Sequence, residues 1–274
     1  MSLVANGPIV IAGVGKMGGA LLERLISRGV HTDFIKIQDP SPSDRINELV
    51  TRHRISCHAR IEKLERSPSI IILAVKPQVM DSVFPPLSKL AGPETIILSI
   101  AAGRTLSSFE KNLPPNTGVV RAMPNTPAQV GRGITACVSN SALSSSQRQF
   151  ATQILSCLGQ VIWLDHETDM DAVTAVSGSG PAYVFHFVEC LTEAGIAEGL
   201  SPNVAAQLAR ATVVGAGELL AGSDLEAAKL RENVTSEGGT TAAALTVLMG
   251  SEGLQKLLSK AVQAASRRSR ELSR

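Results

Sequence analysis

The sequence predicts an α/β protein: an N-terminal Rossmann-type doubly wound sheet followed by an all-helical C-terminal dimerisation domain. From residue 8 to about residue 165, short β-rich runs alternate with helical segments. Near-continuous apolar runs such as residues 70–75 suit strands covered on both faces. After residue 165, alanine, leucine, glutamate and lysine dominate, and glycine and proline stand mainly at segment boundaries. We therefore expect an α/β domain over residues 1–165 and an all-helical domain over residues 166–274.

Each element follows from its own pattern. Short β-rich runs predict strands at residues 9–12, 35–38, 69–75, 95–100, 118–123, 133–138 and 160–164. Helical patterns predict helices in the first domain at residues 17–28, 43–52, 106–112 and 145–157. The second domain is expected to form helices at residues 181–198, 202–220, 225–233, 240–248 and 253–272.

A glycine-rich turn stands between the first predicted strand and the first predicted helix. Gly13, Gly15 and Gly18 have the spacing of a dinucleotide-binding turn. The first glycine allows the turn, the second lets a pyrophosphate approach the backbone, and the third lets the helix pack on the strand. The helix start also offers free N–H groups to the phosphates. Because the context is right on both sides, the pattern favours dinucleotide binding over an ordinary strand-to-helix turn.

Cofactor choice stays open at the end of the second predicted strand. Asp39 stands where an acidic residue would bind the adenosine ribose and repel a 2′-phosphate, which favours NADH. The hydroxyls that follow it and the guanidinium of Arg45 are groups that bind a phosphate, which favours NADPH. Asp39 also suits a simple turn before Pro40.

The composition excludes several functional classes. Aromatic residues make up only 3% of the chain, which argues against base-stacking surfaces and therefore against a nucleic-acid partner. No apolar run reaches the length of a membrane span, so no membrane partner is expected. The first strand begins too close to Met1 for a signal or transit segment, which makes the cytoplasm the expected location. The four cysteines lack metal-binding spacing, and we expect reduced thiols and no metal.

Three loops follow predicted strands at the edge where a doubly wound sheet binds ligands. They cover residues 74–77, 99–103 and 121–127. In the first loop, Pro77 stops the strand and Lys76 is expected in the crevice. In the second, small residues let a flat ring lie against the backbone. In the third, two prolines hold a turn that presents Asn125 and Thr126. Each is an ordinary loop when taken alone, but three on one edge favour a site.

Two segments of the helical domain place glycine and hydroxyl residues before a predicted helix. They are residues 177–181 and 236–241. The free N–H groups at such a helix start can bind a carboxylate. Ordinary capping explains either segment when it is considered alone.

The acid–base groups of common dehydrogenases are missing. Tyr183 is the only tyrosine, and Phe187 stands four residues after it, so the Tyr-x-x-x-Lys pair of short-chain dehydrogenases is absent. The predicted helix 181–198 contains no lysine, which excludes a hydroxyacid dehydrogenase of similar layout. The five histidines fall outside the candidate loops, and His186 is expected in a core or interface. A reductase of a protonated imine depends less on a positioned acid or base, because the C=N group of its substrate is already electrophilic.

Several segments resemble one known family. The stretches 171–183 and 233–241, with the loops 74–77 and 123–127, are similar to those of Δ1-pyrroline-5-carboxylate reductase, the last enzyme of proline synthesis. The chain looks most like an animal cytosolic form, without the longer tail of mitochondrial relatives. The resemblance implies reduction of Δ1-pyrroline-5-carboxylate to L-proline with NADPH or NADH. A non-catalytic dinucleotide-binding sensor or scaffold protein is the alternative, and the intact substrate loops weigh against it.

The resemblance also implies roles for single residues. It places the pyrophosphate at Gly13, Gly15, Lys16, Met17 and Gly18. It places the adenosine ribose or its phosphate near Ser41, and the nicotinamide beside Val75, Lys76, Pro77 and Ala101, with Asn233 also facing the cofactor. The substrate carboxylate is expected at Ser236, Gly239 and Thr240. Thr241 is the implied catalytic residue and would hydrogen-bond the ring nitrogen.

A homo-oligomer is expected from the helical domain. The resemblance implies a homodimer formed through this domain, assembled into a decamer. The helical domain is rich in alanine, leucine and valine and poor in aromatic residues. This composition agrees with helix faces that are buried against another chain.

Overall fold

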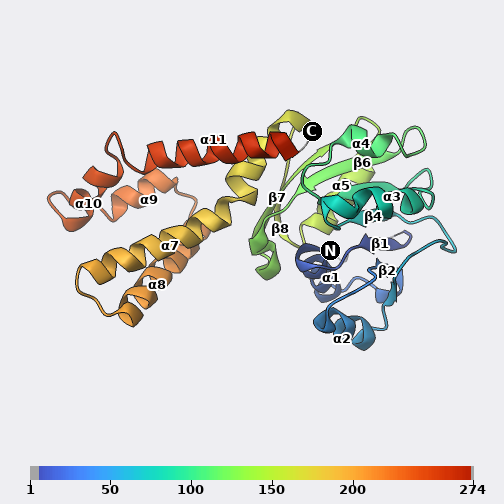
Figure 1. Ribbon diagram of the computed structural model, residues 1–274, viewed down its shortest axis with the longest axis horizontal. Helices are drawn as coiled ribbons and strands as arrows, with labels where there is room; N and C mark the ends of the chain where they lie inside the picture. Colours follow the sequence, from blue (N-terminus) through green and yellow to red (C-terminus); the bar gives the residue numbers. More distant parts are fainter. Residues whose placement is uncertain (1–5, 273–274) are drawn as a thin grey trace. The chain divides into compact units, whose positions relative to one another are not determined.

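The computed structural model describes residues 6–272. The chain divides into two compact units (Figure 1). Unit 1 comprises Met1–Gly178 and Ser266–Arg274, and unit 2 comprises Ser179–Ala265. Unit 1 thus extends beyond residue 165, where the sequence analysis places the domain boundary, and it includes the end of the C-terminal helix. The hydroxyl of Ser269 donates a hydrogen bond to Asp171 within unit 1, with an O–O distance of 2.6 Å.

The described part of unit 1 contains an eight-stranded sheet with the order β3-β2-β1-β4-β5-β6-β7-β8. The strands are β1 (Ile9–Ala12), β2 (Ile35–Gln38), β3 (Ser56–His58), β4 (Ile70–Leu73), β5 (Ile96–Ser99), β6 (Gly118–Met123), β7 (Gly133–Ser139) and β8 (Gly159–Trp163). The chain leaves β1 in one direction to form β2 and β3, and then returns to form β4 on the other side. The doubly wound prediction is confirmed, and the order change at β1 marks the edge where such sheets bind ligands.

Two features of the sheet were not predicted. Strand β3 is a short edge strand, and its residues Ser56, Cys57 and His58 lack an apolar run that would have revealed it. Strand β7 pairs antiparallel with β6, whereas every other neighbouring pair is parallel. The turn Thr126–Val130 is short enough to connect two antiparallel neighbours, whereas a parallel pair needs a longer crossover.

The described part of unit 1 has two buried hydrophobic clusters, and alternate residues of the same strands contribute to one or the other. In β1, Ile9 and Ile11 belong to one buried cluster, and Val10 and Ala12 belong to the other. Helices α1 (Lys16–Ser27), α2 (Asp44–Arg52) and α5 (Ser145–Leu155) supply side chains to the first cluster. Helices α3 (Met80–Ser88) and α4 (Leu106–Glu110) supply side chains to the second. Because successive side chains point to opposite faces, a strand covered on both faces must be apolar throughout. This explains why the run at 70–75 could be assigned from sequence.

The helices of unit 1 are α1 (Lys16–Ser27), α2 (Asp44–Arg52), α3 (Met80–Ser88), α4 (Leu106–Glu110), α5 (Ser145–Leu155) and α6 (Met170–Val173). Helix α3 was not predicted, because Pro85 and Pro86 lie inside it and proline normally interrupts a helix. Phe84 and Leu87 of this helix are buried in the second core cluster. Their burial, about 1.5–3 kcal/mol for each large apolar side chain, offsets the poor local propensity.

Unit 2 is helical within its described residues, as expected. Its helices are α7 (Gly180–Ala197), α8 (Pro202–Ala221), α9 (Ala227–Asn233), α10 (Thr240–Leu248) and α11 (Leu254–Leu272), the last of which ends in unit 1. Helices α7 and α8 lie side by side (Figure 1). The small residues Gly195 and Ala205 let the two backbones approach, since a Cβ on Gly195 would lie 3.3 Å from that of Ala205.

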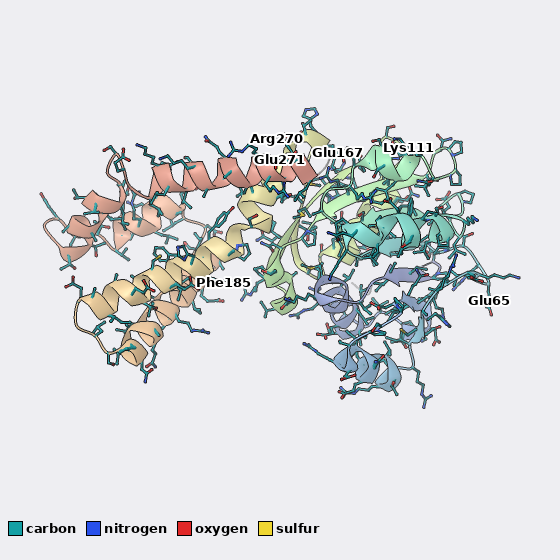
Figure 2. The ribbon with its side chains drawn as sticks, viewed as in Figure 1. Glu65, Lys111, Glu167, Phe185, Arg270 and Glu271 are labelled. Carbon is teal, nitrogen blue, oxygen red and sulfur yellow. The ribbon has the colours of Figure 1, made fainter. Side chains whose placement is uncertain are left out.

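Many apolar side chains of unit 2 are exposed in the single chain. Phe185 on α7 is 64% exposed (Figure 2), and Leu208 and Val214 on α8 are more than half exposed. Helix α8 is the one described helix whose length and mean hydropathy of 1.2 match those of a membrane span. Its sequence contains Arg210 and Glu218 and is therefore not a continuous apolar run. Length and mean hydropathy alone do not place a helix in a bilayer.

Candidate functional site

The turn between β1 and α1 requires glycine at two positions. Gly13 has a φ of +89°, and a Cβ there would lie 2.8 Å from a methyl group of Val75. A Cβ on Gly18 would collide with the carbonyl oxygen of Gly13. Gly15 differs from both, because nothing lies within 4 Å of the position of its Cβ. The open space at Gly15 leaves the backbone accessible to a ligand.

The N-terminus of α1 begins at this open turn. Gly15 is its N-cap, and no side chain caps the helix. The first N–H groups of a helix lack carbonyl partners within the helix, and together with the dipole they form an anion site. Lys16, exposed beside this turn, adds a positive charge. These residues fit the pyrophosphate of a dinucleotide.

Asp39 connects the turn to the loop after β2. Its Oδ2 accepts a hydrogen bond from the backbone N–H of Val14 at 2.8 Å, and its Oδ1 accepts one from the backbone N–H of Ser41 at 2.9 Å. The sequence analysis considered a ribose contact and a simple turn former. Its bond to Ser41, two residues further on, is that of a turn former, and its bond to Val14 also joins the loop after β2 to the β1–α1 turn. The ribose contact stays a prediction.

A cleft of about 750 Å³ extends along these loops. Residues of the glycine turn, α1, the loop after β2, α2 and the 3₁₀ turn Thr126–Val130 line it: Val14, Gly15, Lys16, Gly19, Ala20, Glu23, Asp39, Ser41, Pro42, Ser43, Arg45, Ile46, Gln129 and Val130. The structure thus brings Gly15, Lys16 and Ser41 to one cleft. Arg45, which the sequence analysis considered as a phosphate ligand, forms an ion pair with Glu23 at 2.8 Å.

The loop after β4 adjoins the glycine turn. Ala74 donates a backbone hydrogen bond to Ala12, and Val75 packs against Gly13. Lys76 is exposed, and Pro77 begins a 3₁₀ turn. Three of the residues expected beside the nicotinamide, Val75, Lys76 and Pro77, therefore follow directly from the end of β4.

Arg104 stabilises this region and was not predicted from the sequence. Its guanidinium donates hydrogen bonds to the carbonyl of Pro77 at 3.2 Å and to the carboxylate of Asp81 at 2.8 Å. The Arg104 hydrogen bond lowers the pKa of the Asp81 carboxyl. Arg104 thus connects the loop after β5, which contains the buried Ala101, to the loop after β4. Only the tertiary structure identifies Arg104, because a lone arginine in a loop has no distinctive pattern.

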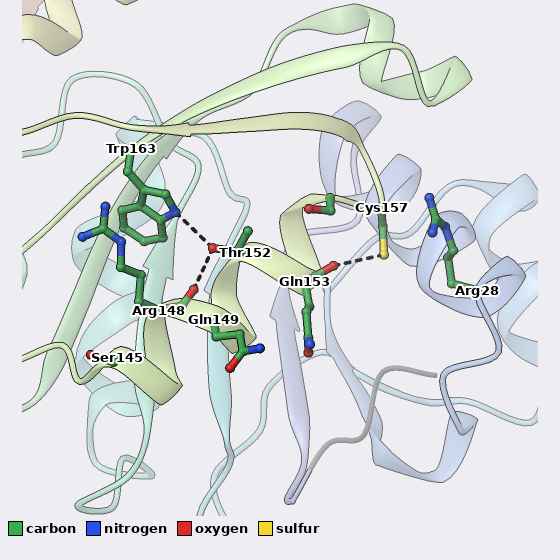
Figure 3. A pocket seen from close by; sticks show the side chains of 9 residues that line it. Arg28, Ser145, Arg148, Gln149, Thr152, Gln153, Cys157 and Trp163 are labelled. Atoms are coloured by element: carbon green, nitrogen blue, oxygen red, sulfur yellow. Dashed lines mark hydrogen bonds between the residues drawn. The ribbon is translucent and has the colours of Figure 1, made fainter. Parts of the chain in front are cut away.

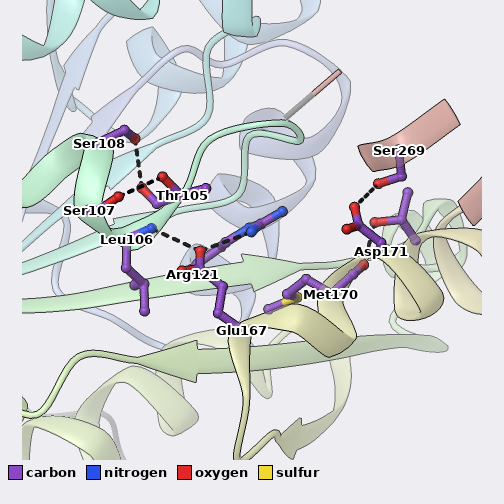
Figure 4. A network of polar contacts seen from close by, with 10 residues as sticks. Thr105, Leu106, Ser107, Ser108, Arg121, Glu167, Met170, Asp171 and Ser269 are labelled. Atoms are coloured by element: carbon purple, nitrogen blue, oxygen red, sulfur yellow. Dashed lines mark hydrogen bonds and ion pairs between the residues drawn. The ribbon is translucent and has the colours of Figure 1, made fainter. Parts of the chain in front are cut away.

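The third candidate loop is held by contacts inside unit 1. Arg121, whose side chain is 8% exposed, forms an ion pair with Glu167 at 2.9 Å (Figure 4). The same oxygen of Glu167 accepts the backbone N–H of Leu106 at the start of α4. Asn125 accepts the backbone N–H of Ile134 at 3.0 Å. The Asn125 side chain, expected to face a ligand, therefore bonds the start of β7.

Ser177 is half-buried, and among the described residues its hydroxyl oxygen is the buried side-chain polar atom without a hydrogen-bond partner. It lies in a π-helical turn at Thr174–Gly178, in the segment that the sequence analysis treated as a helix start. A Cβ on Gly178 would lie 2.8 Å from the methyl group of Met123 at the end of β6. Helix α7 follows, and its N-cap Ser179 makes no side-chain cap bond.

The predicted substrate residues lie together in unit 2. Asn233 ends α9, and Gly239 is the N-cap of α10, with no side-chain cap. The backbone N–H of Gly239 donates to the carbonyl of Ser236 at 3.1 Å, and the Ser236 hydroxyl lies against Gly239. Thr240 and Thr241 form the first turn of α10. This uncapped helix start, flanked by hydroxyl groups, can bind a carboxylate.

A second pocket, of about 610 Å³, lies along α5 and contains none of the predicted site residues (Figure 3). The guanidinium of Arg148 stacks on Trp163 with its carbon 4.3 Å from the ring centre. The indole N–H of Trp163 donates to the hydroxyl of Thr152 at 3.0 Å. The pocket also contains Cys157, whose pKa is raised by burial.

The predictions made for His186 and for the four cysteines can be compared with the structure. His186 is exposed in the single chain and contacts Glu189 on its own helix at 2.9 Å. Cys57, Cys137, Cys157 and Cys190 are free thiols. Burial raises the pKa of Cys137 to about 12, which keeps this thiol protonated and unreactive near neutral pH.

Two family models match successive parts of the chain. The model described as pyrroline-5-carboxylate reductase dimerisation matches residues 167–272. The model described as NADP oxidoreductase, coenzyme F420-dependent, matches residues 8–103.

Relatives and solved structures match nearly the whole chain. A pyrroline-5-carboxylate reductase of Pseudomonas aeruginosa is 38% identical over 265 residues, which are 97% of this chain and 96% of that protein. One of Synechocystis is 38% identical over 267 residues, which are 96% of this chain and 97% of that protein. The structure of the Coxiella burnetii enzyme has a TM-score of 0.91 at 33% identity, and covers 98% of this chain and 99% of that chain.

A further structure, of Plasmodium falciparum pyrroline carboxylate reductase with NADP bound, has a TM-score of 0.81 at 29% identity and covers 98% of this chain and 99% of that chain. The sequence relatives named above are bacterial, so the likeness to an animal cytosolic form stays a prediction. Identities above 30% over nearly the full length of both chains establish the relationship. The chain belongs to the pyrroline-5-carboxylate reductase family.

Proposed function

We propose that this chain performs its family's reaction, the NADPH- or NADH-dependent reduction of Δ1-pyrroline-5-carboxylate to L-proline, with the residues predicted from its sequence. The observation that carries the assignment is the 38% identity to a pyrroline-5-carboxylate reductase over 97% of the chain. The starts of α1 and α10 support the proposal, because each offers backbone N–H groups where the sequence predicts a dinucleotide phosphate and a substrate carboxylate.

The cofactor residues belong to unit 1, apart from Asn233 at the end of α9 in unit 2. The nicotinamide supplies the hydride when the cofactor is bound. Gly13, Gly15, Lys16, Met17 and Gly18 are proposed to form the pyrophosphate site. The free N–H groups at the start of α1 would face the phosphates, whereas the N–H of Gly13 donates to the carbonyl of Gln38 and Gly13 acts through the shape of the turn. Ser41 is proposed to contact the adenosine ribose or its phosphate. Val75, Lys76, Pro77 and Ala101 are proposed to border the nicotinamide, and Asn233 is proposed to contact the cofactor as well.

The substrate residues belong to the start of α10. Ser236, Gly239 and Thr240 are proposed to hold the carboxylate through their hydroxyl and N–H groups. Thr241 is proposed to donate a hydrogen bond to the ring nitrogen, or to accept one, according to the protonation of the nitrogen. The protonated C=N group is electrophilic, so the chain needs to orient the imine rather than to supply a strong acid.

The assembly proposed is a homodimer formed through unit 2 and extended to a decamer in the cytoplasm. The exposed apolar side chains of α7 and α8 support it, because exposed patches of this extent mark interaction surfaces. The match of residues 167–272 to a dimerisation domain supports it as well. A small-molecule substrate is proposed as the functional partner, with no nucleic acid and no membrane.

The reaction is tested with purified protein, pyrroline-5-carboxylate and either NADPH or NADH, followed by the loss of nicotinamide absorbance and by identification of proline. Proline formation with either cofactor supports the proposal. Cofactor binding without any oxidation would instead support a non-catalytic sensor or scaffold protein. Light scattering tests the assembly, and a 28.7 kDa monomer at micromolar concentration would contradict it.

A further inference from the structure

We propose that Glu23 determines cofactor choice by holding Arg45 in an ion pair at the rim of the cleft. This inference rests on the proposed function, since it assumes that the cleft binds the adenosine end of NADPH or NADH. Glu23 was not among the residues considered from the sequence, because a glutamate on a helix has no distinctive pattern.

The two side chains approach each other from different helices. Glu23 lies on α1 and Arg45 on α2, two helices that lie close together in unit 1 (Figure 1). The guanidinium donates to the carboxylate over 2.8 Å. The Glu23 side chain is 30% exposed and the Arg45 side chain 79% exposed, and both line the cleft together with Ser41 and Ser43.

The charges along the cleft are divided between its two ends. Among the described lining residues, Lys16 and Arg45 are the cations, and Glu23 and Asp39 are the anions. Lys16 is at the glycine turn, beside the proposed pyrophosphate site. Asp39 already accepts two backbone hydrogen bonds. Arg45 is therefore the cation at the Ser41 end, and Glu23 is its ion-pair partner there.

The two cofactors make different demands on this pair. NADPH carries a 2′-phosphate with a charge of about −1.5 to −2 at neutral pH, and such a group binds guanidinium strongly. The Glu23 carboxylate occupies one nitrogen of the Arg45 guanidinium, which leaves fewer donors for the phosphate, and it repels the phosphate as long as it stays nearby. NADH has only a hydroxyl there and leaves the pair intact. Glu23 thus disfavours NADPH relative to NADH.

The test measures binding directly and does not require turnover. Adenosine 2′,5′-bisphosphate and AMP differ only in the 2′-phosphate, and calorimetric titration gives their dissociation constants for the full chain. The variants are Glu23→Gln, Arg45→Gln and the double variant. Glu48→Gln is the matched control, because it removes the same charge from α2 at a position that does not line the cleft.

The preference for the bisphosphate is the ratio of the AMP dissociation constant to the bisphosphate dissociation constant. Glu23→Gln is expected to raise this ratio roughly three- to tenfold above that of the unchanged chain. The same substitution is expected to have a clearly smaller effect on that ratio when Arg45 is already glutamine, because the ion pair no longer exists and only the repulsion by the Glu23 charge is removed. Glu48→Gln is expected to leave the ratio unchanged. The ratio of kcat/KM for NADPH and NADH should follow the binding ratio.

Three outcomes would overturn the inference. The first is an unchanged ratio in a folded Glu23→Gln variant. The second is an equal shift in the Arg45→Gln background, which would mean that Glu23 acts through long-range charge alone. The third is an equal shift in the Glu48→Gln control. Failure of the proposed reaction appears separately, as an absence of proline formation by the unchanged chain, while these titrations can still be read.

Discussion

The carboxylate of Asp39 accepts the backbone N–H of Val14 at 2.8 Å, which joins the end of β2 to the glycine turn after β1. Its other oxygen accepts the backbone N–H of Ser41. Both loops line the same cleft. Asp39 therefore acts on the shape of the cleft through the backbone, and a contact with the ribose would be additional to this role.

Replacing Asp39 with serine is expected to weaken NADPH and NADH binding together. Loss of two hydrogen bonds to a carboxylate loosens both loops, at a cost of about 1–2 kcal/mol, or roughly five- to thirtyfold in each dissociation constant. Titration of both cofactors measures the effect, and Asp39→Asn, which keeps one acceptor oxygen, is the control. A selective gain for NADPH with unchanged thermal stability would show that Asp39 discriminates at the ribose instead.

Gly15→Ala and Gly18→Ala form a matched pair that tests the pyrophosphate site. Nothing lies within 4 Å of the position of a Cβ on Gly15, so alanine there should leave the melting temperature almost unchanged. It should nevertheless weaken cofactor binding by about tenfold, ~1.4 kcal/mol, because the methyl group occupies the approach to the backbone. Gly18→Ala should lower both stability and affinity, since its Cβ collides with Gly13. Unchanged affinity in Gly15→Ala would remove the pyrophosphate from this turn.

Thr241→Ala is expected to reduce turnover by several-fold to about tenfold. The hydroxyl orients the imine through a neutral hydrogen bond of ~1 kcal/mol and is not a strong acid, so catalysis should slow rather than stop. Steady-state kinetics on the alanine and serine variants measure the effect, and Thr241→Ser should retain most of the activity. If turnover and the Michaelis constant are both unchanged in Thr241→Ala, this residue does not belong to the site.

Ser236→Ala is expected to raise the Michaelis constant for pyrroline-5-carboxylate by several-fold while turnover stays close to normal. The hydroxyl would contact the carboxylate, which does not change during the reaction, so ground state and transition state lose the same interaction of ~1 kcal/mol. Steady-state kinetics at saturating cofactor separate the two constants. A loss of turnover with an unchanged Michaelis constant would contradict a role limited to carboxylate binding.

Glu167→Ala is expected to lower the free energy of unfolding by about 3 kcal/mol, because it leaves the buried guanidinium of Arg121 without its partner. The same change also removes the acceptor for the backbone N–H of Leu106. Urea unfolding measures the effect. Glu110→Ala is the control, since Glu110 contacts Asn140 at the exposed surface. Equal destabilisation by the two substitutions would show that the Arg121–Glu167 pair contributes nothing beyond a surface contact.

The sequence by itself determined the alternation of strands and helices along the chain, apart from β3, α3 and α6, and the position of the glycine turn. These features depend on local patterns: apolar runs for strands buried on both faces, helical spacing, and glycine where a side chain cannot fit. The runs at β1, β4 and β5 could be assigned for this reason. The resemblance of four segments to one family could likewise be stated from residues that are adjacent in the chain.

Only the tertiary structure decided which side chains meet. Asp39 bonds Val14, Glu23 pairs with Arg45, and Arg104 bonds Pro77, and each of these contacts joins residues more than 20 positions apart. No local pattern encodes them, because each depends on how neighbouring strands and helices bring their loops to one edge of the sheet. The antiparallel direction of β7 and the persistence of α3 through Pro85 and Pro86 were decided in the same way, by pairing with β6 and by burial of Phe84 and Leu87.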